Sequence, residues 1–200
     1  MTPAALRIRL AEIAAEPMAV PAAYREDILP LQDKPPIPAA VLVPVVLGDT
    51  PGVLLTKRTA NLSSHAGQVS FPGGRIDPED SGPEAAALRE AHEEIGLDPG
   101  CVEVLGRMPD YLTGTGYRIT PVLAVVPPDL RYEISAHEVE AIFELPMSVV
   151  MDPDAPRLQR QHVRGVWREY WVWPHPQHYI WGATAAILKR LAERLRERIA

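Results

Sequence analysis

The 200-residue sequence contains only one cysteine, Cys101. A single cysteine cannot form an internal disulfide and has no second cysteine with which to hold zinc. No stretch reaches the roughly 18 apolar residues of a membrane-spanning helix, and Arg and Glu interrupt the apolar residues at the start of the chain. We therefore expect a protein of a reducing, cytoplasmic compartment that lacks an export signal, with Cys101 as a small buried residue.

Positive charge is also scarce, since 20 Lys and Arg residues oppose 26 Asp and Glu residues and the formal net charge is −6. Proteins that follow nucleic-acid polymers or anionic membranes carry basic stripes, so neither is an expected partner. Hydrophobic residues make up 46% of the chain, which is enough to bury a core.

Proline and glycine are plentiful and scattered, which is typical of short elements bounded by turns. We expect residues 1–38 to form an N-terminal helix, over 3–16, and a connector, and residues 39–200 to form a single globular domain. Periodicity predicts strands and helices that combine into a mixed sheet with flanking helices. The expected strands cover 39–47, 53–56, 102–107, 118–126, 140–145 and 163–173, the last as a strand or strand pair, and the expected helices cover 83–95 and 184–199.

Two details follow from local chemistry. Asp80 or Ser81 would cap the helix over 83–95, and Gly96 would end it. The alternating tryptophans of the last predicted strand, Trp167, Trp171 and Trp173, share one face, which favours packing in a core or interface over stacking on a base. The N-terminal helix and these strands are the surfaces that would support a homodimer.

Three glutamates share one face of the helix over 83–95. Glu90, Glu93 and Glu94 lie away from the apolar face that includes Ala91. Like charges four residues apart on a helix cost a few tenths of a kcal/mol, and a hard divalent cation with oxygen ligands would neutralise them. On their own, the glutamates leave a solvated acidic face as an alternative.

Gly73-Gly74 precedes this helix, and the chain from residue 89 to residue 97 reads Arg-Glu-Ala-His-Glu-Glu-Ile-Gly-Leu. Together these resemble the signature of the Nudix hydrolase superfamily, Gly-x5-Glu-x7-Arg-Glu-U-x-Glu-Glu-x-Gly-U, where U is bulky and aliphatic. Asp80 stands where the signature has Glu, with one extra residue before Arg89. The resemblance implies the Nudix fold, an α/β (α+β) domain in which a mixed β-sheet is sandwiched between α-helices.

The same resemblance implies residue roles. Glu90 and Glu94 would bind Mg²⁺ or Mn²⁺ against a diphosphate, with Glu93 as a third ligand or bridge that takes part in catalysis. Arg89 would hold the loop by pairing with Asp80 or Glu93. Hydrolysis also needs a base for the attacking water, and we expect it to be Glu138, in the loop before the strand over 140–145; a plain surface carboxylate is the alternative.

A second segment resembles the motif that precedes this signature in coenzyme A diphosphatases. It consists of Leu54-Leu55-Thr56-Lys57-Arg58, His65, Gly67 and Phe71-Pro72-Gly73-Gly74, although Ser63 replaces an Arg of the motif; residues 180–185 resemble the same group. The implied reaction is divalent-metal-dependent hydrolysis of coenzyme A or its derivatives to 3′,5′-ADP and 4′-phosphopantetheine. The expected substrate-binding residues are Lys57, Arg58, His65, Gly73 and Gly74; for Lys57 and Arg58 a solvated hairpin end is the alternative.

Two other functions stay open. The first is a Nudix diphosphatase for ADP-ribose, dinucleotides or nucleoside triphosphates, which the replacement at Ser63 keeps in view. The second is a module that binds a nucleotide derivative without hydrolysing it, although such a module has no need of three clustered glutamates. In each case the expected partner is a small molecule.

Overall fold

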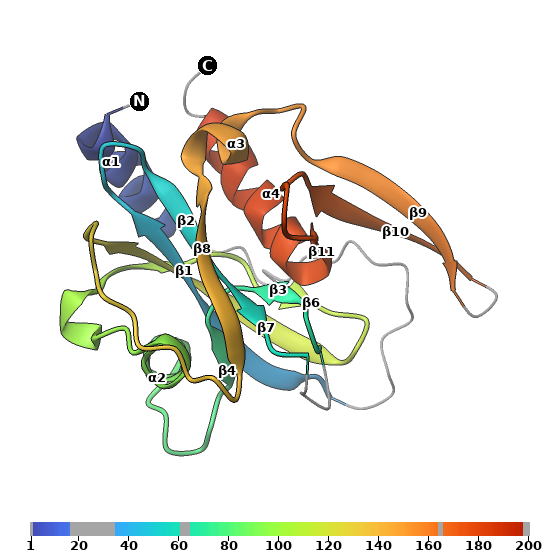
Figure 1. Ribbon diagram of the computed structural model, residues 1–200, viewed down its shortest axis with the longest axis horizontal. Helices are drawn as coiled ribbons and strands as arrows, with labels where there is room; N and C mark the ends of the chain where they lie inside the picture. The colour runs from blue at the N-terminus through green and yellow to red at the C-terminus, as the bar shows by residue number, and fades with distance from the viewer. Residues whose placement is uncertain (1, 17–34, 61–64, 164–165, 198–200) are drawn as a thin grey trace.

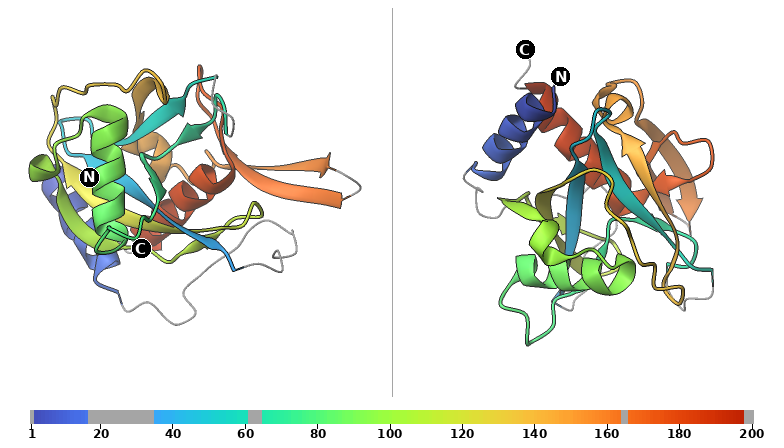
Figure 2. Two further views of the ribbon diagram at one scale, coloured as in Figure 1. Left: turned by 90° about the horizontal axis from the view of Figure 1, so that it is seen from below. Right: turned by 60° about the vertical axis from the view of Figure 1, so that its left-hand side comes forward.

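The structure is a computed structural model that describes residues 2–16, 35–60, 65–163 and 166–197. A large mixed sheet lies in the middle of the molecule, with helices on both of its faces (Figures 1 and 2). The α-helices of the described chain are α1 (Pro3–Ala14), α2 (Pro83–Ile95), α3 (Met147–Met151) and α4 (Gly182–Glu197), and a short 3-10 helix covers Pro99–Cys101. The predicted class, a mixed sheet sandwiched between helices, is confirmed.

The large sheet is built around β1. Its strands are β1 (Ile37–Val46), β2 (Gly52–Arg58), β3 (Val69–Ser70), β4 (Gly73–Arg75), β5 (Glu103–Arg107), β6 (Tyr111–Leu112), β7 (Tyr117–Val126) and β8 (Val139–Pro146). β1 pairs with β7 in parallel along its whole length, and on its other side with β2 at its end and with β4 at its start. The glycines of β4 therefore lie beside the start of the central strand.

The two faces of β1 bury different residues because side chains alternate along a strand. Val43 and Val45 pack into the core that contains α1 and α4, whereas Ala40 and Leu42 pack into the core under α2. Burial on both faces accounts for the nearly continuous apolar sequence of this strand. The helix with the three glutamates is thus held against one face of the sheet.

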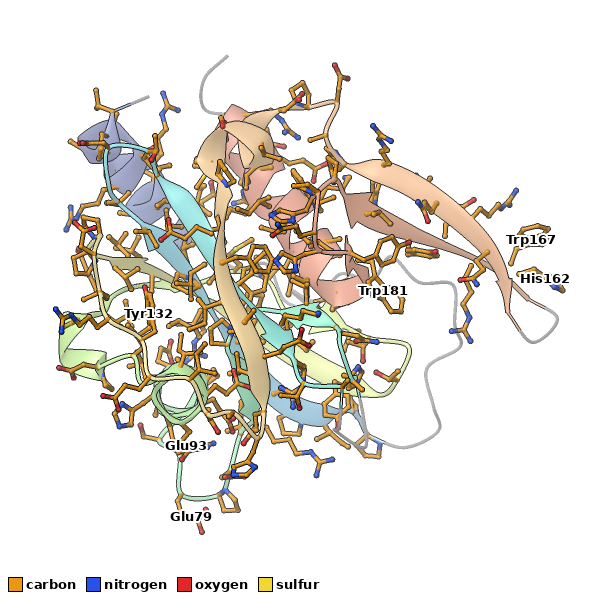
Figure 3. The ribbon with its side chains drawn as sticks, in the orientation of Figure 1. Glu79, Glu93, Tyr132, His162, Trp167 and Trp181 are labelled. Atoms are coloured by element: carbon orange, nitrogen blue, oxygen red, sulfur yellow. The ribbon has the colours of Figure 1, made fainter. Side chains whose placement is uncertain are left out.

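A second sheet consists of β9 (Arg157–Val163), β10 (Val166–Trp173) and β11 (Ile180–Trp181). The β9–β10 hairpin projects from the body of the molecule (Figures 1 and 2). Trp173, at the base, is 1% exposed and donates from Nε1 to the Ala185 carbonyl at 3.0 Å. Of the two alternatives, a core or an interface, Trp173 takes the core, whereas Trp167 is 53% exposed at the far end of the hairpin (Figure 3).

Two further local expectations are wrong. The N-cap of α2 is Gly82, because the carboxylate of Asp80 is taken up by Arg89 and Ser81 makes no capping bond; Gly96 ends the helix in the left-handed region as expected. Cys101 is exposed, since it belongs to a short surface turn.

The N-terminal helix packs on the body of its own chain. Leu6, Leu10 and Ile13 are buried in the core that α4 also fills. Most of the predicted connector falls on residues 17–34, which lie outside the described residues. Within the described chain, no helix combines the length and the apolar character that crossing a bilayer requires.

Candidate active site

Two glycines allow β4 to fit between β1 and α2. A Cβ atom on Gly73, whose φ is +152°, would lie 2.4 Å from the carbonyl oxygen of Ala40. A Cβ atom on Gly74 would lie 2.5 Å from the carboxyl carbon of Glu90. Only glycine therefore permits the backbone to approach the glutamates this closely.

Glu94 is the buried member of the glutamate set, with 2% of its surface exposed. Its Oε1 accepts from Nη1 of Arg58 at 3.0 Å, and its Oε2 accepts from the backbone N–H of Gly73 at 3.2 Å. Burial raises the pKa of Glu94 to about 7, although Arg58 and the Gly73 N–H act in the opposite direction. Arg58 and the Gly73 N–H therefore balance the negative charge of Glu94 only in part.

Glu90 lies one turn earlier on α2, with a side chain that is 17% exposed. Burial raises its pKa, and the negative charges of Glu93 and Glu138 raise it further, whereas Arg89 lowers it. Glu93 is more open, with 56% of its side chain exposed and one contact at 3.2 Å to Nη1 of Arg89 (Figure 3).

Arg89 ties the loop before α2 to the helix. Its guanidinium donates to both carboxylate oxygens of Asp80, at 3.1 and 3.0 Å, and to the carbonyl of Arg75 at 3.2 Å. It also donates to Glu90 Oε1 at 2.9 Å, and these hydrogen bonds raise the pKa of Arg89 above its ordinary value. Of the two carboxylates expected to pair with Arg89, Asp80 makes the bidentate contact and Glu93 a single one.

Glu138, from the loop before β8, lies near Arg58 and Glu94 although it is distant from them in sequence. The N–H groups of Glu133 and Ser135 donate to the carbonyls of Ile95 and Glu94, each at 2.9 Å, which attaches this loop to the end of α2. Gly96 leaves room for it, because a Cβ there would lie 3.0 Å from the backbone nitrogen of Glu133. As a result, Oε2 of Glu138 lies 4.0 Å from Nη2 of Arg58.

Lys57 and Arg58 diverge although they are adjacent in sequence. Arg58 reaches Glu94, whereas Nζ of Lys57 donates to Glu140 at 2.7 Å. Successive strand residues face opposite sides of a sheet, which accounts for the separation. Lys57 therefore lies apart from the other expected substrate-binding residues.

A cavity of about 460 Å³ lies between the large sheet and the start of α4, and Glu90, Glu93 and Glu94 are not among the residues that line it. Arg58, His65, Gly73 and Gly74 all line it, and Nδ1 of His65 lies 2.9 Å from Oε1 of Gln68. The opposite wall comes from the second sheet and the start of α4, and includes residues for which the sequence had suggested no ligand-binding role: Arg168, Tyr170, Trp171 and Trp181. Ser63, the departure from the coenzyme A diphosphatase motif, lies outside the described residues.

The donor set fits a hard divalent cation. Glu90 and Glu94 are carboxylates on one helix face whose pKa values are raised by burial. Within the residues that the structure describes, no three His, Cys, Asp or Glu side chains form a ready-made metal site. Mg²⁺ characteristically uses one or two carboxylates together with water and substrate phosphates, so two glutamates suffice for it.

The structure is thus an α+β domain in which a mixed sheet carries a glutamate-bearing helix on one face. The sequence matches the family model of the NUDIX domain over residues 36–180. The chain therefore belongs to the Nudix hydrolase family, as the sequence predicted. Nudix hydrolases act on diphosphate bonds and generally use divalent metal ions.

Curated relatives agree with this assignment. The chain is 45% identical over 159 residues to the uncharacterized Nudix hydrolase NudL of Escherichia coli K12. The aligned segment covers 77% of this chain and 80% of the relative. NudL of Cronobacter sakazakii is 46% identical over 165 residues, or 80% and 83% of the two chains.

Among solved structures, the Nudix hydrolase RenU of M. smegmatis has a TM-score of 0.52 at 24% identity, covering 84% of this chain and 89% of that one. The NUDIX domain of Shewanella oneidensis NrtR, solved with ADP ribose, has a TM-score of 0.51 at 20% identity, covering 84% and 90%. At these identities the likeness establishes the fold.

Proposed function

We propose that this protein hydrolyses the diphosphate bond of coenzyme A or its derivatives with Mg²⁺ or Mn²⁺, giving 3′,5′-ADP and 4′-phosphopantetheine. One observation carries the proposal: the segments that resemble coenzyme A diphosphatases meet around one cavity. Arg58, His65 and the Gly73-Gly74 pair lie on one side of it, and Trp181 with the start of α4 lies on the other. Its volume of about 460 Å³ is within the range typical of small-molecule sites, roughly 300–1,000 Å³.

The diphosphate would react where the cavity comes nearest to Glu94, since Arg58 and Gly73 line the cavity and both donate to this carboxylate. Glu90 and Glu94 would hold the metal, with Glu93 as a third ligand. A bound divalent ion supplies charge neutralisation and a more acidic water. Arg58 lines the cavity beside Glu94, so its guanidinium is available to a phosphate oxygen.

Glu138 is the proposed base. Its carboxylate is 46% exposed and 4.0 Å from Arg58, so water has access to it beside the glutamates of α2. During hydrolysis a water oxygen forms a bond to one phosphorus atom, and the bond from that phosphorus to the bridging oxygen breaks. Glu138 would take the proton that the water loses.

A substrate comparison tests the proposal. Purified protein with Mg²⁺ is incubated separately with coenzyme A, ADP-ribose, NADH and dGTP, and kcat/KM is measured for each. Coenzyme A is expected to give the highest value. A preference for ADP-ribose would overturn the substrate assignment, and binding without turnover of any of the four would support the non-catalytic alternative.

The metal assignment is tested by Glu94→Gln, which keeps the size of the side chain but removes its charge. We expect kcat/KM to fall about 100-fold or more, with the circular-dichroism spectrum unchanged. Glu79→Gln is the matched control, since Glu79 is exposed in the loop before α2 (Figure 3). Near-normal turnover in Glu94→Gln would contradict the assignment.

A further inference from the structure

The charges around the cavity are uneven. Arg58, Arg75, Arg168 and His65 line it, whereas the carboxylate among the described lining residues belongs to Glu169. That carboxylate is already paired, because its Oε1 lies 3.2 Å from Nε of Arg160. A cavity with this lining favours an anionic ligand, although the protein as a whole carries a net charge of −6.

Arg168 differs from the other two arginines of the lining. Arg58 is bonded to Glu94, and Arg75 donates to the hydroxyl of Tyr117 at 3.1 Å. With respect to the described part of the chain, the side chain of Arg168 has no ion pair or hydrogen bond, and its Nε is buried without an acceptor. A guanidinium has five donors in a planar fork that matches phosphate oxygens, so an anion in the cavity would give Arg168 the partner it lacks.

Aromatic residues of the second sheet also line the cavity. Tyr170 and Trp171 follow Arg168 on β10, and Trp181 comes from β11. The rings of Tyr170 and Trp181 are 5.6 Å apart, and Trp181 is 37% exposed beside the start of α4 (Figure 3). Aromatic residues and an arginine in one cavity wall provide stacking for a base and an anchor for a phosphate.

Arg168 also lies on a different wall from the reacting end. Arg58, Gly73 and Gly74 belong to the large sheet and contact the glutamates of α2, whereas Arg168 belongs to the second sheet. We propose that Arg168 binds a phosphoryl group that is not part of the scissile diphosphate and so determines specificity for nucleotides with an additional phosphate on the sugar. The proposal rests on the proposed function, in which this group is the 3′-phosphate of the coenzyme A nucleotide.

Binding of two nucleotides that lack a diphosphate tests the proposal without turnover. Calorimetry compares 3′,5′-ADP with 5′-AMP, which differ by the 3′-phosphate alone. The wild type is expected to bind 3′,5′-ADP about 10- to 100-fold more tightly, the range for charge-assisted hydrogen bonds. In Arg168→Gln the ratio should fall to about 1, and Arg168→Lys should restore part of it.

Arg157→Gln is the matched control, because Arg157 lies on the adjacent strand, is exposed and does not line the cavity. It makes the same change in charge and should leave the binding ratio as in the wild type. Equal binding of the two nucleotides by the wild type, or an unchanged ratio in Arg168→Gln, would overturn the proposal.

A kinetic comparison separates this proposal from the proposed function. The ratio of kcat/KM for coenzyme A to that for 3′-dephospho-coenzyme A should exceed 10 in the wild type and approach 1 in Arg168→Gln. The change should come from a higher KM for coenzyme A in the variant. If the wild type hydrolyses neither compound but its nucleotide preference depends on Arg168, the subsite stands and the proposed function fails. If the wild type and Arg168→Gln hydrolyse coenzyme A equally well, the proposed function stands and the Arg168 subsite fails.

Discussion

Arg58 lies between two carboxylates with different surroundings. Glu94, at 3.0 Å, is buried, whereas Glu138, at 4.0 Å, has 46% of its side chain exposed. A buried carboxylate held by two donors is suited to a fixed cation, and an exposed one to exchange of a proton with water. The two glutamates therefore suit the separate roles proposed for them.

Changing Glu138 to Gln removes the proton acceptor and keeps the side-chain size. General bases contribute about 100-fold or more to rate, so kcat for coenzyme A should fall by about that factor while KM changes little. Steady-state kinetics of Glu138→Gln provide the measurement. Glu140→Gln is the control, since Glu140 pairs with Lys57; equal losses in both variants would argue against Glu138 as the base.

The residues that sequence reasoning located are those with a local pattern. Glu90, Glu93 and Glu94 follow from helical spacing, and Gly73-Gly74 from its turn chemistry. Arg168 and Trp181 come from segments about 80 to 100 residues further along the chain, and no local spacing relates them to the glutamates. Only the packing of the second sheet against the first brings these distant residues to the same cavity.

Helix α2 is held at both of its ends. At its start, Glu84 accepts from Nε and Nη2 of Arg107 on β5, at 2.5 and 2.6 Å. At its end, the N–H groups of Glu133 and Ser135 bind its last carbonyls. These contacts fix the helix relative to the sheet, and the glutamates with it.

The Glu84–Arg107 pair makes stability depend on pH. Hydrogen bonding to Arg107 lowers the pKa of Glu84 from its ordinary value of 4.5. Because the folded pKa is the lower one, the contribution is complete well above pH 4.5 and is lost as pH falls through the folded value. The pair is partly exposed, so we expect Glu84→Gln to be about 0.5 kcal/mol less stable than the wild type at pH 7, a difference that vanishes at acidic pH.

Urea unfolding at pH 7, 5, 4 and 3 measures this difference. Glu79→Gln removes a carboxylate of the preceding loop that has no ion pair within the described chain, and its stability should follow that of the wild type throughout. A Glu84→Gln deficit that stays constant down to pH 3 would show that the ion pair is not its source.

Elements with strong periodicity agree with the sequence prediction to within a few residues, whereas the shortest strands and the polar strand β9 are absent from it. β4 consists of Gly73–Arg75, a sequence with low intrinsic strand propensity, and it is a strand because it pairs with β1. β9 has the largely polar sequence RLQRQHV and pairs with β10 over its length. Such strands depend on their neighbours, which a local pattern does not contain.

Across the whole molecule, the face of the sheet opposite α2 is covered by segments that flank the matched Nudix region. The family match ends at residue 180, while α1 precedes it and α4 begins at Gly182. Both helices bury apolar residues in one core, and the start of α4 forms part of the cavity wall. The flanking helices therefore contribute to stability, and α4 to the cavity as well.

Leu10→Ala tests the contribution of α1. Leu10 is fully buried, and truncation of a buried leucine costs about 2–5 kcal/mol. Urea denaturation should show a loss in this range, with kcat/KM unchanged for the folded protein because α1 does not line the cavity. Ile8→Ala on the same helix is the control, since Ile8 is 57% exposed and should lose little. Equal stability of the two variants would contradict the expectation.

In the absence of ligand, Arg58 acts as an internal counter-ion of Glu94. A divalent cation that binds Glu94 competes with this guanidinium, and the guanidinium lines the cavity in which an anion would bind. Metal and anionic ligand should therefore bind cooperatively, each raising the affinity of the other by the same factor. Calorimetric titrations of Mn²⁺ and of 3′,5′-ADP, each with and without the other, measure both factors. The cooperativity should weaken in Arg58→Gln, and independent binding in the wild type would exclude this coupling.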